Sequence, residues 1–154
     1  RAAELVMREL VGSAFPDHGV SGEEFGTERP DAEWRWVFDP IDGTKSFISG
    51  SLAFGTQIAL LHMGAPVLGL INQPITGERW LGVAERDTTL NGVTIQTSAT
   101  TKVEQAIVYT SALEQFDSIR RARFEALTAK ARFTRFSHDC YAAGSSARKQ
   151  CLRL

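Results

Sequence analysis

The sequence predicts a layered α/β fold of the α+β kind, in which helices accompany a sheet that is mostly antiparallel. Residues 1–14 and 113–131 place apolar side chains at helical spacing, which predicts two amphipathic helices. Residues 52–95 alternate β-rich apolar runs with short turn sequences, which is the pattern of strands joined by hairpins. The chain has 154 residues, 43% hydrophobic and 23% charged, so it can bury the core of one ordinary domain.

The first part of the chain is predicted to be a helix followed by a loop. The helix over residues 1–14 ends before Pro16, because proline cannot continue it. Residues 16–33 are rich in Gly, Pro, Asp and Glu, so we expect a loop that carries Glu23 and Glu24 toward the next strand. His18 lies in this loop and is interpreted as a turn residue rather than a metal ligand.

The middle of the chain is predicted to supply the sheet. The sequences Met63-Gly64 and Asn91-Gly92 favour tight hairpin turns. Trp80 and His62 lie within strand patterns and are assigned to the core. The expected strands cover residues 34–38, 54–62, 67–73, 79–84 and 93–96.

The later part of the chain is predicted to contain a strand at residues 106–110, the helix at 113–131 and a strand at 132–136. Basic side chains of this helix alternate with acidic ones, which indicates a solvated face rather than a nucleic-acid surface. Asp139 then opens a further helix, for which it is a good N-cap.

Charge and cysteine content exclude several classes of protein. A net charge of −1 gives no electrostatic case for binding nucleic acid or an anionic membrane. No apolar run reaches the length of about 18 residues that a membrane-spanning helix requires. Cys140 and Cys151 make neither a disulfide framework nor a CxxC zinc site, so a reducing, cytoplasmic location is expected.

A metal site is predicted where the strand at residues 34–38 meets two carboxylates. Pro40 has no backbone donor, so the strand is expected to end at Asp39 and the chain to turn. This turn would free the Ile41 carbonyl to face a cation and return Asp42 to the side of Asp39. Two carboxylates held so close repel each other unless a cation lies between them.

The residues that follow add a phosphate site to the metal site. Oxygen ligands of this kind suit Mg²⁺, which completes its shell with water and substrate phosphate. Gly43 allows a ligand to approach the backbone closely, and Thr44 offers a hydroxyl and can start a short helix whose N–H groups bind an anion. Asp-Pro and Asp-Gly are also common turn dipeptides, so either one alone would indicate only a surface turn.

The segment from Trp36 to Thr44, continued by residues 45–50, resembles the signature of the inositol monophosphatase family of Mg²⁺-dependent phosphatases. Gly22-Glu23-Glu24 resembles that family's Gly-Glu-Glu loop, which implies that Glu23 is a metal ligand and helps to orient the attacking water. The resemblance also implies a sugar-phosphatase-like fold, with a mixed sheet packed between helices.

Several stretches are most similar to the branch of the family that hydrolyses histidinol phosphate. The segment Asp139-Cys140-Tyr141-Ala142 is one, and it implies that Asp139 contacts the amino-alcohol end of the substrate. Other similar stretches are residues 45–50, 54–62, 72–74 and 77–80.

The resemblance covers residues 1–144 and leaves residues 145–154 as an unrelated tail. It implies a partial domain that lacks a preceding helix and the C-terminal part, including the family's last metal-binding Asp. Such a domain is expected to expose apolar surface that promotes aggregation or pairing, as in a homodimer.

The favoured function is hydrolysis of a phosphate monoester, with histidinol phosphate as the substrate that the resemblance implies. The first alternative is a phosphatase of the same family that acts on inositol 1-phosphate or another small monoester. The second is an inactive, truncated domain that serves at most as a binding module. The predicted metal ligands are Glu23, Asp39, the Ile41 carbonyl and Asp42; Glu23 and Thr44 orient water, and Asp42, Gly43, Thr44 and Asp139 bind phosphate or substrate.

Overall fold

The computed structural model describes residues 1–146 and divides the chain into two compact units. The first unit contains residues 1–42 and 55–94, and the second contains residues 43–54 and those from Ile95 onward. The predicted tail at 145–154 lies outside the described residues from position 147.

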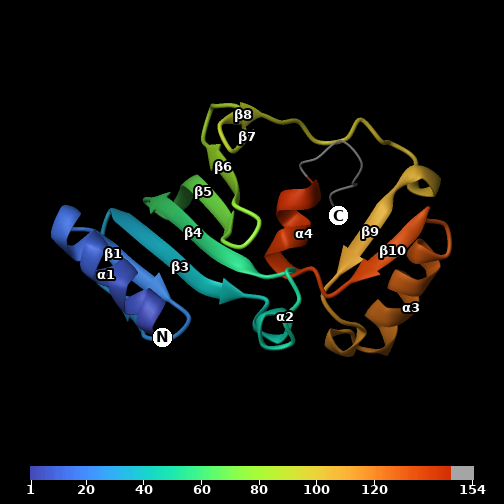
Figure 1. Ribbon diagram of the computed structural model, residues 1–154, viewed down its shortest axis with the longest axis horizontal. Coiled ribbons are helices and arrows are strands. Elements are labelled where there is room, and N and C mark those ends of the chain that lie inside the picture. The colour runs from blue at the N-terminus through green and yellow to red at the C-terminus, as the bar shows by residue number, and fades with distance from the viewer. Residues whose placement is uncertain (147–154) are drawn as a thin grey trace. The chain divides into compact units, whose positions relative to one another are not determined.

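The first unit is built on an eight-stranded sheet with the strand order β2-β1-β3-β4-β5-β6-β7-β8 (Figure 1). All neighbouring strands are antiparallel except β1 and β3, which run parallel, so the predicted mixed sheet is confirmed. The strands are β1 (Gly19–Gly22), β2 (Gly26–Glu28), β3 (Trp34–Asp42), β4 (Gly55–His62), β5 (Ala65–Gln73), β6 (Glu78–Val83), β7 (Thr89–Leu90) and β8 (Val93–Thr94).

Two tight turns shape this sheet as the sequence predicts. Met63 and Gly64 have φ angles of 49° and 82° between β4 and β5, and Asn91 and Gly92 have the same two values between β7 and β8. Positive φ at both central residues is the geometry of a type I′ hairpin, whose twist matches that of the strands.

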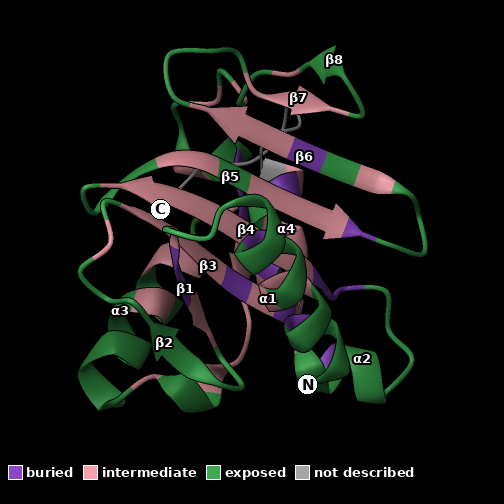
Figure 2. Ribbon diagram, turned by 90° about the vertical axis from the view of Figure 1, so that its left-hand side faces the viewer, coloured by how far each residue is buried: buried purple, intermediate pink, exposed green. Residues whose placement is uncertain are grey.

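The predicted first helix is confirmed as α1 (Ala2–Ala14), but its apolar face is only partly buried. Figure 2 shows α1 across the sheet where β1 and β3 run, and the helix contacts both strands. Val11 and Met7 pack on Val20 and Phe38 to form the core beneath the helix. Three predicted apolar-face residues are instead exposed, while the fully buried side chain of the helix is a carboxylate, Glu4. The exposed residues are Leu5, Val6 and Leu10.

The segment between α1 and β3 differs from the prediction of a loop. Residues 19–28 form the short strands β1 and β2, and Glu23 and Glu24 lie in the turn between them. The strand pattern is hard to see because Gly, Ser and Thr dominate it, and because tertiary pairing with β3 rather than local propensity stabilises it.

The second unit contains a small parallel sheet of β9 and β10, with α3 beside β10 in Figure 1. The predicted helix at 113–131 starts too early, because the side chain of Asp117 accepts a hydrogen bond from the Arg120 N–H and caps a shorter helix. The elements are α2 (Thr44–Ile48), η1 (Val103–Gln105), β9 (Ile107–Thr110), η2 (Leu113–Gln115), α3 (Ser118–Thr128), β10 (Phe133–Phe136) and α4 (Asp139–Ser146).

Trp80 and His62 were both predicted to lie in the core, but only Trp80 does so. Trp80 is buried as predicted, with 4% of its surface exposed. His62 is not a core residue, because its ring stacks on Trp34 at 4.1 Å and its Nε2 contacts the exposed carboxylate of Glu33. His18 lies in the turn before β1, where its Nδ1 accepts a hydrogen bond from the indole N–H of Trp36.

None of the helices in the described part of the chain is long and apolar enough to cross a membrane.

Candidate functional site

The parallel pairing of β1 with β3 brings two predicted metal ligands to one edge of the sheet. Gly22, the last residue of β1, pairs with Phe38. The next residue of each segment is a carboxylate, Glu23 on one and Asp39 on the other. Because the carboxyl ends of parallel strands meet at the same edge, the register alone places these two acids side by side.

A bulge in β3 returns Asp42 to the region of Asp39. Pairing with β4 stops at Asp39 and resumes at Asp42, with a shift of register between them. The prediction that β3 ends at Asp39 is therefore wrong, although the break in the ladder lies at Pro40, which has no N–H to donate. Thr56 Oγ1 on β4 donates to the Pro40 carbonyl at 2.9 Å and holds the bulge.

Within this bulge the backbone folds onto the Asp39 carboxylate. The Ile41 N–H donates to Asp39 Oδ1 at 3.2 Å, which is a local Asx turn. This bond orients the carboxylate, while the role of the Ile41 carbonyl as a ligand stays a prediction.

The negative charges of Glu23 and Asp42 act on the Asp39 carboxylate, so both lie near it. Burial, which is the largest cause, and the negative charges of Glu23 and Asp42 together raise the pKa of Asp39 from its ordinary value of 3.8 to about 6. A hydrogen bond with the Glu23 side chain also favours the protonated form, while the Ile41 N–H opposes the shift. A carboxylate surrounded in this way gains from a cation beside it.

The donor set fits Mg²⁺ better than a cation that needs a full cage of protein ligands. Among the described residues, no group of three or more His, Cys, Asp or Glu side chains is arranged to hold a metal by itself. Mg²⁺ is usually bound through one or two carboxylates and keeps water and substrate phosphate as further ligands. Glu23 is exposed and Asp39 is half-buried, so one side of the pair is open to such ligands.

The predicted phosphate-binding residues belong to the second unit. Helix α2 begins at Thr44 as predicted, after Gly43 with a φ of 84°. A side chain at Gly43 would lie 2.9 Å from the Ala53 carbonyl and 3.0 Å from Asp139 Oδ2, so only glycine fits there. The structure thus places the Asp139 carboxylate against the backbone that leads into Thr44.

The prediction of Asp139 as an N-cap is wrong. Helix α4 begins at Asp139 itself, and the Ala142 N–H donates to the carbonyl of His138, the residue before the helix. Asp139 has a φ of 24°, and Ser46 Oγ of α2 lies 3.5 Å from the Ser137 carbonyl just upstream. The carboxylate of Asp139 is therefore not engaged as a conventional cap and faces Gly43.

Comparison with known proteins identifies the family. The sequence matches the inositol monophosphatase family over residues 1–152. The chain belongs to this family. Relatives and solved structures then show how much of a family member the chain represents.

Two relatives and one solved structure illustrate the match. The chain is 43% identical over 142 residues to the chloroplastic bifunctional phosphatase IMPL2 of Arabidopsis thaliana, covering 91% of this chain and 41% of that protein. It is 36% identical over 142 residues to the histidinol-phosphatase of Chlorobaculum parvum, covering 92% and 55%. An inositol monophosphatase from Zymomonas mobilis matches with a TM-score of 0.90 and 41% identity, covering 98% and 58%. The chain thus spans about half the length of these inositol monophosphatase relatives.

The buried contact between α1 and the turn that carries Glu23 was not predicted from the sequence. Glu4 of α1 is fully buried, and its Oε2 accepts the Glu24 N–H at 2.9 Å. Arg8, one helical turn later, donates to Glu4 Oε1 at 2.9 Å. The spacing of a Glu and an Arg at positions i and i+4 was the available signal, but such pairs usually lie on a solvated helix face.

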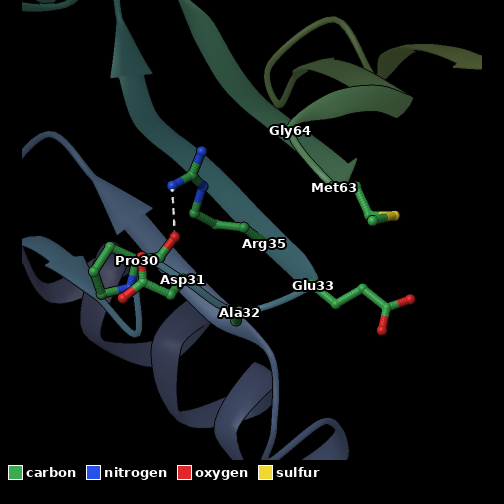
Figure 3. Close-up of a pocket in the computed structure, with 7 residues that line it drawn as sticks. All are labelled: Pro30, Asp31, Ala32, Glu33, Arg35, Met63 and Gly64. Carbon is green, nitrogen blue, oxygen red and sulfur yellow. Dashed lines mark hydrogen bonds between the residues drawn. The ribbon is translucent and has the colours of Figure 1, made fainter.

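A separate pocket of about 470 Å³ lies between residues 30–35 and the hairpin turn at Met63 and Gly64 (Figure 3). In Figure 3 the Arg35 side chain points toward Pro30, and its Nη1 donates to the Pro30 carbonyl at 3.2 Å. Arg35 precedes Asp39 by four residues, or about 13 Å along an extended strand. None of the residues that line this pocket is a predicted site residue, so the carboxylate edge is the better candidate for chemistry.

Proposed function

We propose that this member of the inositol monophosphatase family forms the metal-binding part of a Mg²⁺-dependent phosphate monoester hydrolase whose substrate is histidinol phosphate. The observation that carries this proposal is the register that places Glu23 beside Asp39, where burial and the charges of Glu23 and Asp42 raise the pKa of Asp39 to about 6. Family membership supports the reaction class, and the histidinol-phosphatase relative supports the substrate.

Each predicted site residue has a task in direct hydrolysis. Glu23, Asp39, Asp42 and the Ile41 carbonyl would hold Mg²⁺, which supplies charge neutralisation for the phosphoryl group and acidifies water. Glu23 and the Thr44 hydroxyl would orient the attacking water for in-line attack. As the new P–O bond forms, the ester P–O bond would break, and the leaving alkoxide would take up the proton that the water loses. The N–H groups of Gly43 and Thr44 donate to the phosphoryl oxygens as negative charge develops on them.

Asp139 supports the choice of an amino-alcohol phosphate. Its carboxylate lies against the Gly43 backbone, next to the residues assigned to the phosphate. Histidinol carries a primary ammonium that such a carboxylate can bind through a charge-assisted hydrogen bond. Inositol has no cation for this position. Inositol 1-phosphate is nevertheless the second candidate, because the matched structure from Zymomonas mobilis is an inositol monophosphatase at 41% identity.

The proposal extends to a cytoplasmic location and to a homodimer. Cysteine usage supports the cytoplasm, although the Arabidopsis relative is named as chloroplastic. Leu5, Val6 and Leu10 leave an apolar strip exposed on α1, which supports pairing with a second copy as a homodimer.

The proposal is tested by measuring phosphate release from histidinol phosphate and inositol 1-phosphate in parallel, with Mg²⁺ and then with a chelator. We expect chelator-sensitive release that is faster from histidinol phosphate. Asp42→Asn should lower the rate by at least about 100-fold, because even residues that only orient metal ligands contribute about 10–100-fold. Asp17→Asn removes an exposed carboxylate of the same unit and should leave the rate unchanged.

Three results would contradict this assignment in different ways. Faster release from inositol 1-phosphate would replace the substrate and keep the site. An unchanged rate in Asp42→Asn would refute the site residues. No release from either substrate by a folded chain would favour the inactive binding module over the enzyme.

A further inference from the structure

The turn between β1 and β2 is fastened to α1 at several points. Glu4 Oε2 accepts the Glu24 N–H at 2.9 Å, in the middle of the turn. Arg8 reaches the far side of the turn, where Nη1 donates to Glu28 Oε1 at 2.8 Å and Nη2 donates to the Gly26 carbonyl at 2.5 Å. The turn that carries Glu23 is therefore held on both sides by two residues of one helix.

The Glu4 carboxylate also fills the space beside the last residue of β1. A side-chain carbon at Gly22 would lie 2.0 Å from Glu4 Oε1, so the absence of a side chain at Gly22 lets the carboxylate reach the turn. Gly22 precedes Glu23 and pairs with Phe38, the residue before Asp39. The Glu4 carboxylate thus packs against the backbone of Gly22, at the point where the chain leaves β1 and continues into Glu23.

A buried charged pair is an unusual way to anchor a helix for stability alone. None of the Glu4 surface is exposed, and only 8% of the Arg8 side chain is. Removing such a pair from water costs about as much as its attraction returns, so apolar residues would stabilise the same contact equally well. Apolar side chains cannot, however, accept a backbone N–H or fix the direction of a turn.

We propose that Glu4, held by Arg8, is a positioning residue that fixes the backbone of the β1–β2 turn so that the Glu23 carboxylate faces Asp39. The inference rests on the proposed function, because it assigns Glu4 a purpose in the metal site. In this proposal Glu4 acts through its bond to the turn and is not itself a metal ligand.

The decisive variant is Glu4→Gln, which keeps the shape of the side chain and removes its charge. The measurements are Mn²⁺ binding by electron paramagnetic resonance, Mg²⁺ affinity by competition with Mn²⁺, and hydrogen exchange of the Glu24 amide. Arg8→Lys is a second variant that keeps the charge but loses the forked contacts to Gly26 and Glu28. Arg1→Gln is the matched control, because Arg1, the residue before α1, also contacts Glu24 but through an exposed ion pair at 3.0 Å.

We expect Glu4→Gln to weaken Mn²⁺ and Mg²⁺ binding by about tenfold or more, in line with residues that orient metal ligands. The Glu24 amide should exchange faster, while amides in β4 and β5 keep their protection. Arg8→Lys should show a smaller loss of the same kind, and Arg1→Gln should stay within about twofold of the parent chain.

A purely structural role would give a different pattern. Glu4→Gln would then melt at a lower temperature but bind Mn²⁺ within about twofold of the parent when folded, and this result would overturn the proposal. A parent chain that binds neither ion would refute the proposed metal site and with it the purpose assigned to Glu4. Phosphate release is not needed for any of these readouts, so a wrong substrate assignment cannot be confused with a failure of the inference.

Discussion

Two segments bring carboxylates to the same edge of the sheet, and they are held in different ways. The β1–β2 turn, which carries Glu23, is held by side chains of α1, a separate element. The end of β3, which carries Asp39 and Asp42, is held largely by local features: a proline, an Asx turn and one hydrogen bond from β4. The first segment therefore depends on packing at a distance, and the second depends mainly on its own sequence.

The largest effect on stability is expected from a substitution that fills the space that the Glu4 side chain occupies. Gly22→Ala puts a methyl group where the Glu4 carboxylate lies, and Glu4 cannot move aside without losing its bonds to Arg8 and Glu24. We expect the free energy of unfolding to fall by about 1–3 kcal/mol, as for other overpacked sites. Chemical denaturation measures this change.

The matched control is Gly69→Ala, because Gly69 also lies in a strand but has no atom within 4 Å of an added side-chain carbon. Alanine there should be neutral or slightly stabilising, by up to about 1 kcal/mol. Equal losses of stability at the two glycines would show that Glu4 does not constrain the turn.

The effect of pH sharpens the comparison on the β3 side. Asp39 has a pKa of about 6 when folded and an ordinary value of 3.8. Between these values the folded, metal-free chain binds more protons than the unfolded one, so its stability falls as pH rises from about 4 to about 6. Mg²⁺ requires the ionised carboxylate, so its apparent affinity should fall about tenfold per pH unit below 6.

Denaturation in the presence of a chelator and Mn²⁺ titration at pH 7, 6 and 5 measure these two trends. Asp39→Asn should remove the trend in metal-free stability, because the amide does not titrate. A Mn²⁺ affinity that is constant from pH 7 to pH 5 would contradict the role of Asp39 as a ligand.

The smallest effect is expected from the hydrogen bond between Thr56 of β4 and the bulge. Thr56→Val removes the hydroxyl that donates to the Pro40 carbonyl and should lower the free energy of unfolding by about 0.5–1.5 kcal/mol. Thr56→Ser keeps the hydroxyl and should recover most of this loss. If valine and serine had the same effect in thermal melts, the bulge would be shaped by Pro40 without help from β4.

The sequence predicts the β3 side of the site well because its determinants are local. The order of Asp39, Pro40, Asp42 and Gly43 encodes the break in the ladder and the start of α2 at Thr44, and the structure shows both. Only the bounds of β3 were wrong, because the strand resumes after the bulge. Turns of Met63-Gly64 and Asn91-Gly92 were predictable for the same reason.

On the β1 side, Glu23 was predicted from the family resemblance, but the strand and the helix contact that hold it were not, because their determinants are distant in the sequence. β1 has only four residues, two of them glycine, and it exists through parallel pairing with β3. Glu4 is a charged residue on an amphipathic helix, and nothing nearby in sequence indicates that it is buried. Burial of His62 was wrongly predicted from its strand pattern, since the end of a hairpin is exposed whatever the alternation of the strand.

The carboxylates at this edge of the sheet, and the residues that hold them, are also close together in the sequence. The Glu4–Arg8 pair, the β1–β2 turn and the bulge all lie between Glu4 and Asp42, and Thr56 of β4 adds a partner from later in the chain. Closing short loops costs little chain entropy, so contacts of this kind form quickly. The carboxylates proposed to bind the metal thus lie within one stretch of the chain, and β4 is the later strand that pairs with the end of this stretch.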